Sequence, residues 1–121
     1  KFGKYGGTDT GGSAPAEDCT YVELGFRPQL LIIKRSNADG DPWIIEDSSR
    51  DTSNFAFRAH KLGTTTTPVS SGDQFAIDFL ANGFKCRSNN AGINNASATY
   101  LYAAFASHPF GGENTPPLTA R

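Results

Sequence analysis

Short apolar stretches separated by glycine- and proline-containing bends run through most of the chain. The stretch Cys19–Leu24 is partly alternating and rich in β-branched and aromatic residues, and it stops at Gly25-Phe26-Arg27-Pro28. This pattern predicts a strand and a turn, because Gly25 can adopt a positive φ and Pro28 fixes φ for the next element. Leu30–Ile33 is then continuously apolar, which predicts a central strand that is buried on both faces.

Two neighbouring strand pairs follow along the sequence. Trp43–Ile45 resumes an apolar pattern after a polar loop, so it is expected to lie beside the central strand. Phe75–Leu80 alternates and leads into Asn82-Gly83, a hairpin signal because a type I′ turn needs a positive φ at both central residues. Phe84–Arg87 is expected to return antiparallel to it.

Two more strands are predicted from aromatic patterns. Phe55–His60 places both of its rings on one face, which predicts a half-buried strand with Ala56 on the opposite face. Thr99–Ala106 is the last long element, with Tyr100 and Tyr102 on one face. Its alanines leave a helix as the competing interpretation, but the Tyr-Leu-Tyr run favours a strand.

The pattern as a whole predicts an all-β fold, an antiparallel β-sandwich (jelly-roll-like) of about seven short strands. The sandwich is expected to span residues 19–108. Residues 1–18 are rich in glycine and are expected to form a lead-in or an edge ribbon, and residues 109–121 an extended Pro-rich tail.

Composition then narrows the class of protein. A chain of 121 residues is long enough for one domain. Its net charge of −1 gives no basic field for nucleic acid, and no apolar run is long enough to span a membrane, so a soluble protein is expected. Leu, Ile, Val and Phe number 24, about 20% of the chain, which is lean for a self-sufficient core. We therefore expect a component of an assembly, with copies of itself as partners.

Metal and disulfide chemistry are weakly supported by the sequence. Cys19 and Cys86 are expected to be small buried thiols, although their pairing stays open. With His60 and His108 they would suit zinc, but none of the close ligand pairs of structural zinc sites is present. The spacing of Asn37, Asp39 and Asp41 resembles the start of a calcium loop, whose sixth and twelfth positions here have the wrong residues. No cofactor or metal is expected.

Two catalytic constellations can be drawn from residue types alone. The residues are Asp47, Ser48 and His60 for an activated hydroxyl, and Glu46, Asp47 and Asp78 for acid–base cleavage of glycosides. No motif brings either set together. The prediction is that the chain is not an enzyme, and a depolymerase acting through the carboxylates is the third hypothesis.

Aromatic rings offer a different kind of site. Surface contacts with sugars are considered for Tyr5, Trp43, Tyr100 and Tyr102, together with Tyr21, because rings stack on the apolar faces of glycans. The competing interpretation, that most of these rings fill the lean core, is favoured, for Trp43 as well. A carbohydrate-binding module is accordingly the alternative function.

A family resemblance joins several of these segments in order. The blocks are Gly25-Phe26-Arg27-Pro28 with Leu30–Lys34, then Trp43, then Asp47-Ser48 with Arg50, then Asn82-Gly83-Phe84, and finally Tyr100–Phe110. Together they resemble a module of bacteriophage virion proteins, over about Tyr21 to Phe110. The resemblance implies a tail-fibre, tail-tip or other particle-surface protein without a cofactor, located in the virion. It leaves open attachment to a bacterial surface glycan. The shared residues Gly25, Pro28, Asn82 and Gly83 are interpreted as turn residues rather than as ligands.

Overall fold

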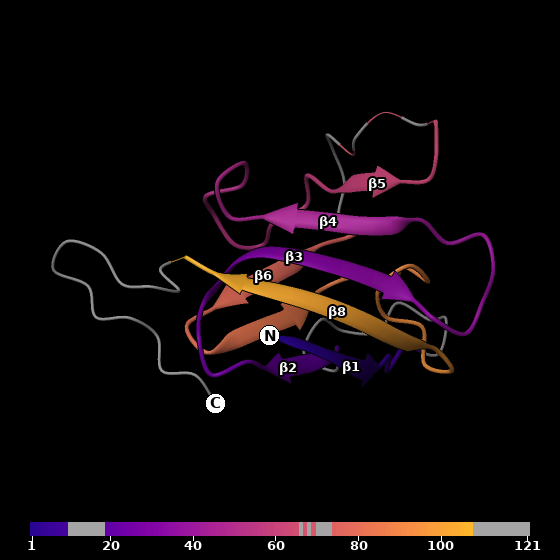
Figure 1. Ribbon diagram of the computed structural model, residues 1–121, viewed down its shortest axis with the longest axis horizontal. Helices are drawn as coiled ribbons and strands as arrows, with labels where there is room; N and C mark the ends of the chain where they lie inside the picture. Colours follow the sequence, from indigo (N-terminus) through magenta and orange to yellow (C-terminus); the bar gives the residue numbers. More distant parts are fainter. Residues whose placement is uncertain (10–18, 66, 68, 70–73, 108–121) are drawn as a thin grey trace, which may run out of the picture.

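Eight β-strands form two antiparallel sheets in the computed structural model, which describes residues 1–9, 19–65, 67, 69 and 74–107 (Figure 1). The strands are β1 (Phe2–Gly6), β2 (Tyr21–Glu23), β3 (Pro28–Arg35), β4 (Trp43–Asp47), β5 (His60–Leu62), β6 (Ile77–Leu80), β7 (Gly83–Cys86) and β8 (Thr99–Ala106). The described residues contain no helix, and hence none of the length and apolarity that a membrane span needs. The predicted all-β sandwich is therefore confirmed.

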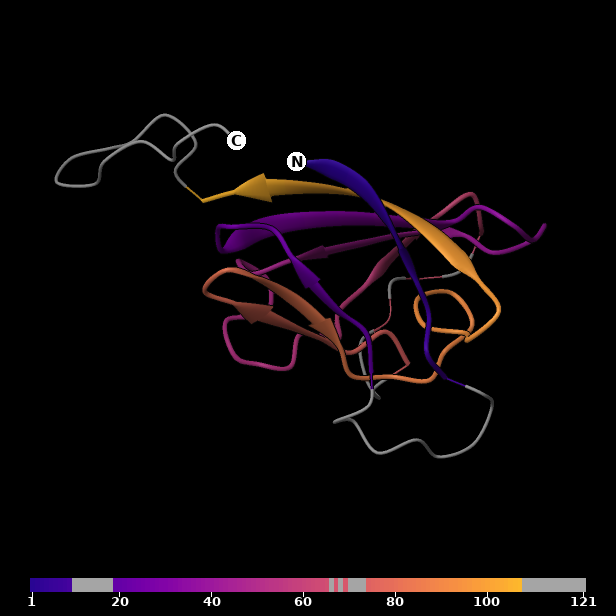
Figure 2. The same cartoon turned by 90° about the horizontal axis from the view of Figure 1, so that it is seen from below.

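The larger sheet has five strands in the order β1-β8-β3-β4-β5. Its central strand is β3, as predicted, and it pairs with β8 on one side and β4 on the other. Leu31 and Ile33 are fully buried, whereas Leu30 and Ile32 on the opposite face are only half-buried. The prediction that this strand is buried on both faces was wrong, because the second sheet covers one face alone (Figure 2).

The smaller sheet has the order β2-β7-β6, and its hairpin differs in detail from the prediction. Leu80 pairs with Gly83, so Ala81 and Asn82 occupy the bend and Gly83 is the first residue of β7. Gly83 has no positive φ, so the predicted type I′ turn centred on Asn82 and Gly83 was wrong. Glycine is required there for another reason, since a Cβ would lie 2.2 Å from the carbonyl oxygen of Val22.

The core lies between the two sheets and is largely aromatic on the side of β1 and β8. Tyr5 stacks on Tyr100 with ring centroids 5.0 Å apart, and Phe84 meets Tyr5 and Tyr102 edge-on. The Tyr5 hydroxyl donates to the Ile93 carbonyl at 2.7 Å. The Tyr100 hydroxyl donates to the Ala91 carbonyl at 2.6 Å and accepts from the Asn95 amide at 2.8 Å. The rings of Tyr5 and Tyr100 are thus buried while their hydroxyls keep backbone partners, which is how tyrosine is accommodated in a core.

The segment between β4 and β5 departs most from the prediction. The predicted half-buried strand over Phe55–His60 was wrong, because only the isolated bridge at Ala56 and the first residue of β5, His60, are extended there. Phe55 is exposed, whereas Ala56 and Ala59 are both fully buried, which the alternation of a strand does not allow. Ala56 forms an isolated antiparallel bridge with Ile77 of β6 through two backbone hydrogen bonds of 2.8 and 2.9 Å. So close a backbone approach leaves room for a methyl group and not for a ring.

The first and the last described strands, β1 and β8, lie side by side. Phe2–Gly6 forms the edge strand β1 and pairs along β8, which is a strand and not the competing helix. Gly25 has φ +83°, and the buried Pro28 begins β3. The part of the predicted lead-in at residues 10–18 and the predicted tail at 109–121 lie outside the described residues.

Candidate interaction face

The side of the five-stranded sheet that points away from the second sheet forms one continuous surface, which we call the outer face. Strand alternation places every second side chain there. The cross-strand register aligns Leu30 with Phe105 and Ile32 with Ala103, and it aligns Trp43 with Leu62. The residues of the outer face are Phe2, Lys4, Leu30, Ile32, Lys34, Trp43, Ile45, Asp47, His60, Leu62, Leu101, Ala103 and Phe105.

This face carries most of the large apolar side chains that the described residues expose. Seven such side chains are exposed, and five of them lie on the outer face. Their exposed fractions are 77% for Phe2, 47% for Trp43, 52% for Leu62, 47% for Leu101 and 45% for Phe105. Single exposed apolar residues are ordinary, but a contiguous group of this kind marks an interaction surface.

Charged side chains lie near both ends of the strands on the outer face, and Lys34 lies on the central strand β3 between Leu101 of β8 and Trp43 of β4. Lys4 and Lys34 flank Leu101 on the two neighbouring strands. Asp47 lies at the other end of the strands, beside Leu30. An apolar centre with charged groups around it is the usual anatomy of a protein–protein interface.

The charged groups at both ends are held by local contacts. The Lys34 ammonium donates to the Asp41 carbonyl, and the Arg35 guanidinium lies 3.3 Å from the Asp41 carboxylate. Burial raises the pKa of Asp47, but hydrogen bonds from Arg50 and Ser49 and the charge of Arg50 outweigh it, so this pKa lies below its ordinary value. These contacts fix the side chains that surround the apolar centre.

The exposed side of the three-stranded sheet has the opposite character. Glu23, Asp78 and Lys85 point outward there, and the Arg87 guanidinium lies 3.1 Å from the Asp78 carboxylate. This is the alternation expected of a sheet with one solvated face. Tyr21 is the large hydrophobic side chain that these strands expose, against five on the outer face, so the apolar cluster belongs to the larger sheet.

Of the five aromatic residues considered as glycan contacts, Trp43 and Tyr21 are exposed, and the favoured interpretation that most of these rings fill the core is confirmed for the other three. Tyr5, Tyr100 and Tyr102 are 7%, 0% and 8% exposed and lie in the core, so their prediction as surface contacts was wrong. Trp43 is exposed on β4, against the expectation that it fills the core. The pairing of β1 with β8 buries the tyrosines together, and no local pattern indicates that pairing.

The sequence prediction missed most of the outer face. Phe2, Leu62, Leu101 and Phe105 were not singled out as surface residues. One indication was present in Thr99–Ala106, whose two faces are both apolar, with Leu101, Ala103 and Phe105 opposite the tyrosines. A strand of this kind in a two-layer fold must expose one apolar row.

The predicted carboxylate set is divided among three places. Glu46 is 1% exposed on the core side of β4, Asp47 is on the outer face, and Asp78 belongs to the other sheet. Burial raises the pKa of Glu46 to about 8, Arg50 lowers it, and the charges of Asp51 and Asp47 raise it further. Three carboxylates in these positions do not converge on one substrate.

The other predicted constellations are also separated or already bonded. Asn37 bonds the Ser97 carbonyl and the Thr99 amide, and Asp41 pairs with Arg35, so these oxygens have partners within the protein. Cys19 and Cys86 are buried and form no disulfide with each other, and burial raises the pKa of Cys86 to about 12. Within the described ranges no three metal-ligating side chains gather, and His108 lies outside those ranges.

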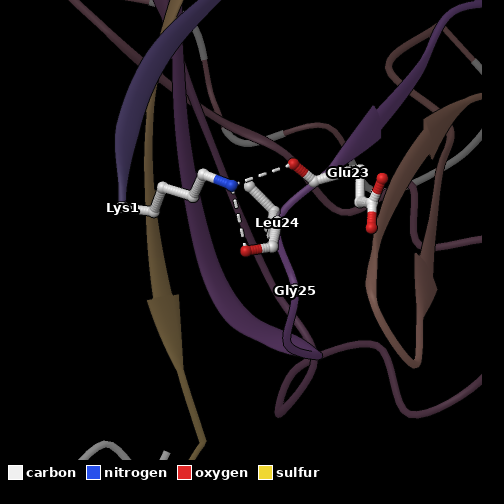
Figure 3. Close-up of a pocket in the computed structure, with 4 residues that line it drawn as sticks. All are labelled: Lys1, Glu23, Leu24 and Gly25. Atoms are coloured by element: carbon white, nitrogen blue, oxygen red, sulfur yellow. Dashed lines mark hydrogen bonds between the residues drawn. The ribbon is translucent and has the colours of Figure 1, made fainter. Parts of the chain in front are cut away.

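A small hollow of about 190 Å³ lies beside the end of β2, lined by Lys1, Glu23, Leu24 and Gly25 (Figure 3). The Lys1 ammonium donates to the carbonyl oxygens of Glu23 at 3.2 Å and Leu24 at 3.1 Å. The protein itself therefore uses the acceptors that a ligand would need there.

The protein is thus an antiparallel β-sandwich in which the outer face of the larger sheet is apolar. The chain belongs to the family described as Domain of unknown function (DUF7483), which it matches over residues 1–109. No curated protein and no solved structure matches it.

Proposed function

We propose that this chain is a non-enzymatic structural domain of a bacteriophage particle, in the tail fibre, the tail tip or elsewhere on the particle surface. Its role is assembly with other particle proteins and copies of itself. The observation that carries the assembly role is the clustering of five exposed large apolar side chains on the outer face. The particle setting is supported by the ordered sequence blocks between Tyr21 and Phe110.

The chemistry of the outer face supports binding to protein rather than turnover of a substrate. Its centre consists of aliphatic and aromatic side chains, and the nearest carboxylate, Asp47, is bonded by Arg50. Such a surface gains free energy by losing contact with water, at about 25 cal/mol per Å² of apolar area. Of the residues considered for catalysis, Asp47 and His60 lie on this face, but the Asp47 carboxylate already accepts hydrogen bonds from Arg50.

The test is the composition of particles. Phage particles whose genome encodes this chain are purified by density gradient, and their proteins are identified and quantified by mass spectrometry. We expect peptides of this chain in many copies per particle, in constant ratio to known particle proteins through successive gradients. Absence of these peptides from infectious particles would overturn the proposal.

A carbohydrate-binding module is the second candidate, favoured by the exposure of Trp43, at 47%, among the rings considered for sugar contacts; Tyr21 is also exposed, but on the smaller sheet. An exposed indole can stack on a sugar ring. A glycan array probed with the full chain and with Trp43→Ala tests it. Binding that is lost in the variant supports the module, and an empty array removes it.

A further inference from the structure

We infer that the occupant of the outer face is a second copy of this chain, packed face to face through the five-stranded sheets in a two-fold dimer. This inference deepens the proposed function by naming the partner. It rests on the area of the apolar centre, on the placement of the lysines, and on the character of the sheet edge.

The area is sufficient for a pair of copies. A large apolar side chain has about 200 Å² of surface, so the exposed fractions of Phe2, Trp43, Leu62, Leu101 and Phe105 leave about 500 Å² open to water. Two copies would then bury about 1,000 Å² from these side chains alone, the lower limit for a specific interface. The half-buried neighbours add to this area.

The lysines select the orientation. Lys4 and Lys34 lie at one end of the strands, on either side of Leu101, and Asp47 lies at the other end. The two-fold axis would lie between the two sheets, parallel to them and perpendicular to the strands. It brings the lysine end of one copy against the Asp47 end of its partner. The opposite orientation sets lysines against lysines, which is unfavourable in a partly desolvated interface.

The edge of the sheet is a poorer contact for a second copy than its face. In an antiparallel pair of β1 edges centred on Lys4, the two Lys4 side chains would lie directly opposite each other. Like charges in that position oppose pairing, and an edge lysine is a common protection against it. Face-to-face packing keeps both edges free of this conflict.

The only tryptophan of the chain, Trp43, lies within the outer face and reports on the contact directly. Full-length protein is followed by sedimentation equilibrium and by tryptophan emission from about 1 µM to about 1 mM. We expect a monomer–dimer equilibrium and a blue shift of the emission maximum that follows the same concentration curve, because dimer formation removes water from the indole.

Leu101→Glu is the disrupting variant. A glutamate there is flanked by Lys4 and Lys34 on the neighbouring strands, so cross-strand attraction stabilises it in the folded monomer. In the dimer the same charge would lose its contact with water against the partner's sheet. We expect the dimer dissociation constant to rise by about tenfold or more, with an unchanged far-UV spectrum.

Tyr21→Glu is the matched control, because Tyr21 is 44% exposed, close to the 47% of Leu101, but lies on the smaller sheet. It should leave the dissociation constant unchanged. A wild-type monomer throughout the concentration range would overturn the inference, and so would a dimer that persists in Leu101→Glu or dissociates in Tyr21→Glu.

The outcomes separate this inference from the proposed function. A monomer in solution whose peptides are present in purified particles overturns the two-fold contact and leaves the particle role standing. A dimer whose peptides are absent from particles does the reverse.

Discussion

Gly83 shows how a single residue type can be required by distance rather than by backbone angle. The hairpin places it where β7 passes β2, and any Cβ would lie 2.2 Å from the Val22 carbonyl oxygen. The three nearest atoms are backbone atoms of Val22 and Glu23 in β2, which cannot shift as a flexible side chain would. The side chain must therefore be absent for the smaller sheet to form.

We expect Gly83→Ala to lower the free energy of unfolding by about 3 kcal/mol, since overpacking against backbone commonly costs 1–3 kcal/mol. Gly6→Ala is the matched control, because nothing lies within 4 Å of its Cβ position. It should change stability by less than about 1 kcal/mol. Urea unfolding of both variants measures the difference, and equal stabilities would contradict the explanation.

Glu46 is a second residue whose properties are set by its position in the fold, because burial raises the pKa of its carboxyl group. Its folded-state pKa of about 8 lies above the 4.5 of an unperturbed glutamate. The folded chain therefore holds the extra proton between these values, and the free energy of unfolding must fall as pH rises from about 4.5 to about 8. The upper limit of the slope is about 1.4 kcal/mol per pH unit.

Glu46→Gln should remove this pH dependence, because an amide has the shape of the protonated acid and does not ionise. The variant should match the wild type near pH 4 and exceed it in stability near pH 9. Chemical unfolding at a series of pH values measures both curves. Glu23→Gln, at an exposed carboxylate on β2, should keep the wild-type slope. A wild-type stability that does not fall up to pH 9 is incompatible with the proposed cause.

At the scale of elements, a buried carboxylate helps to shape the segment between β4 and β5, which Asn54 also ties to the backbone of Phe79 in β6. The Asp51 carboxylate accepts hydrogen bonds from the amides of Phe57 at 2.8 Å and Arg58 at 3.0 Å. It is buried, at 8% exposed, and these bonds hold the segment in a shape in which the alanines face the core.

Asp51→Asn replaces the charged acceptor and should lower the free energy of unfolding by about 1–3 kcal/mol. Amide hydrogen exchange at Phe57 and Arg58 should accelerate more than exchange in β3. Asp39→Asn, at an exposed loop position, is the control and should change neither quantity. Unchanged exchange at Phe57 in Asp51→Asn would show that the carboxylate does not organise this segment.

Most strands were predictable from the sequence because their patterns are local. The continuous run Leu30–Ile33 and the alternation in Thr99–Ala106 identify β3 and β8, and a two-residue bend follows Leu80. The pairing of β1 with β8 was not predictable, since it joins residues almost a hundred positions apart. The burial of Tyr5, the exposure of Trp43 and the extent of the outer face all depend on it or on similar long-range pairings.

At the scale of the whole molecule, the two sheets present surfaces of opposite character. The smaller sheet shows charged residues such as Lys85 and Asp78, and the larger sheet shows the apolar outer face. The layer arrangement in Figure 2 places these surfaces on opposite sides of the domain. Association through one surface therefore leaves the other in water, which limits growth to closed pairs instead of extended aggregates.

The first described residue lies beside the last strand: the Lys1 backbone nitrogen is 2.7 Å from the Ala104 carbonyl oxygen (Figure 2). The first and last described strands therefore begin and end close together in space, which is the arrangement in which circular permutation and domain insertion are tolerated. A short Gly-Ser linker from Ser107 to Lys1 would join the two strands covalently. New chain ends can then be opened in the bend between Ala81 and Asn82. We expect such a permuted chain to retain the sandwich, because the contact between β1 and β8 would be kept.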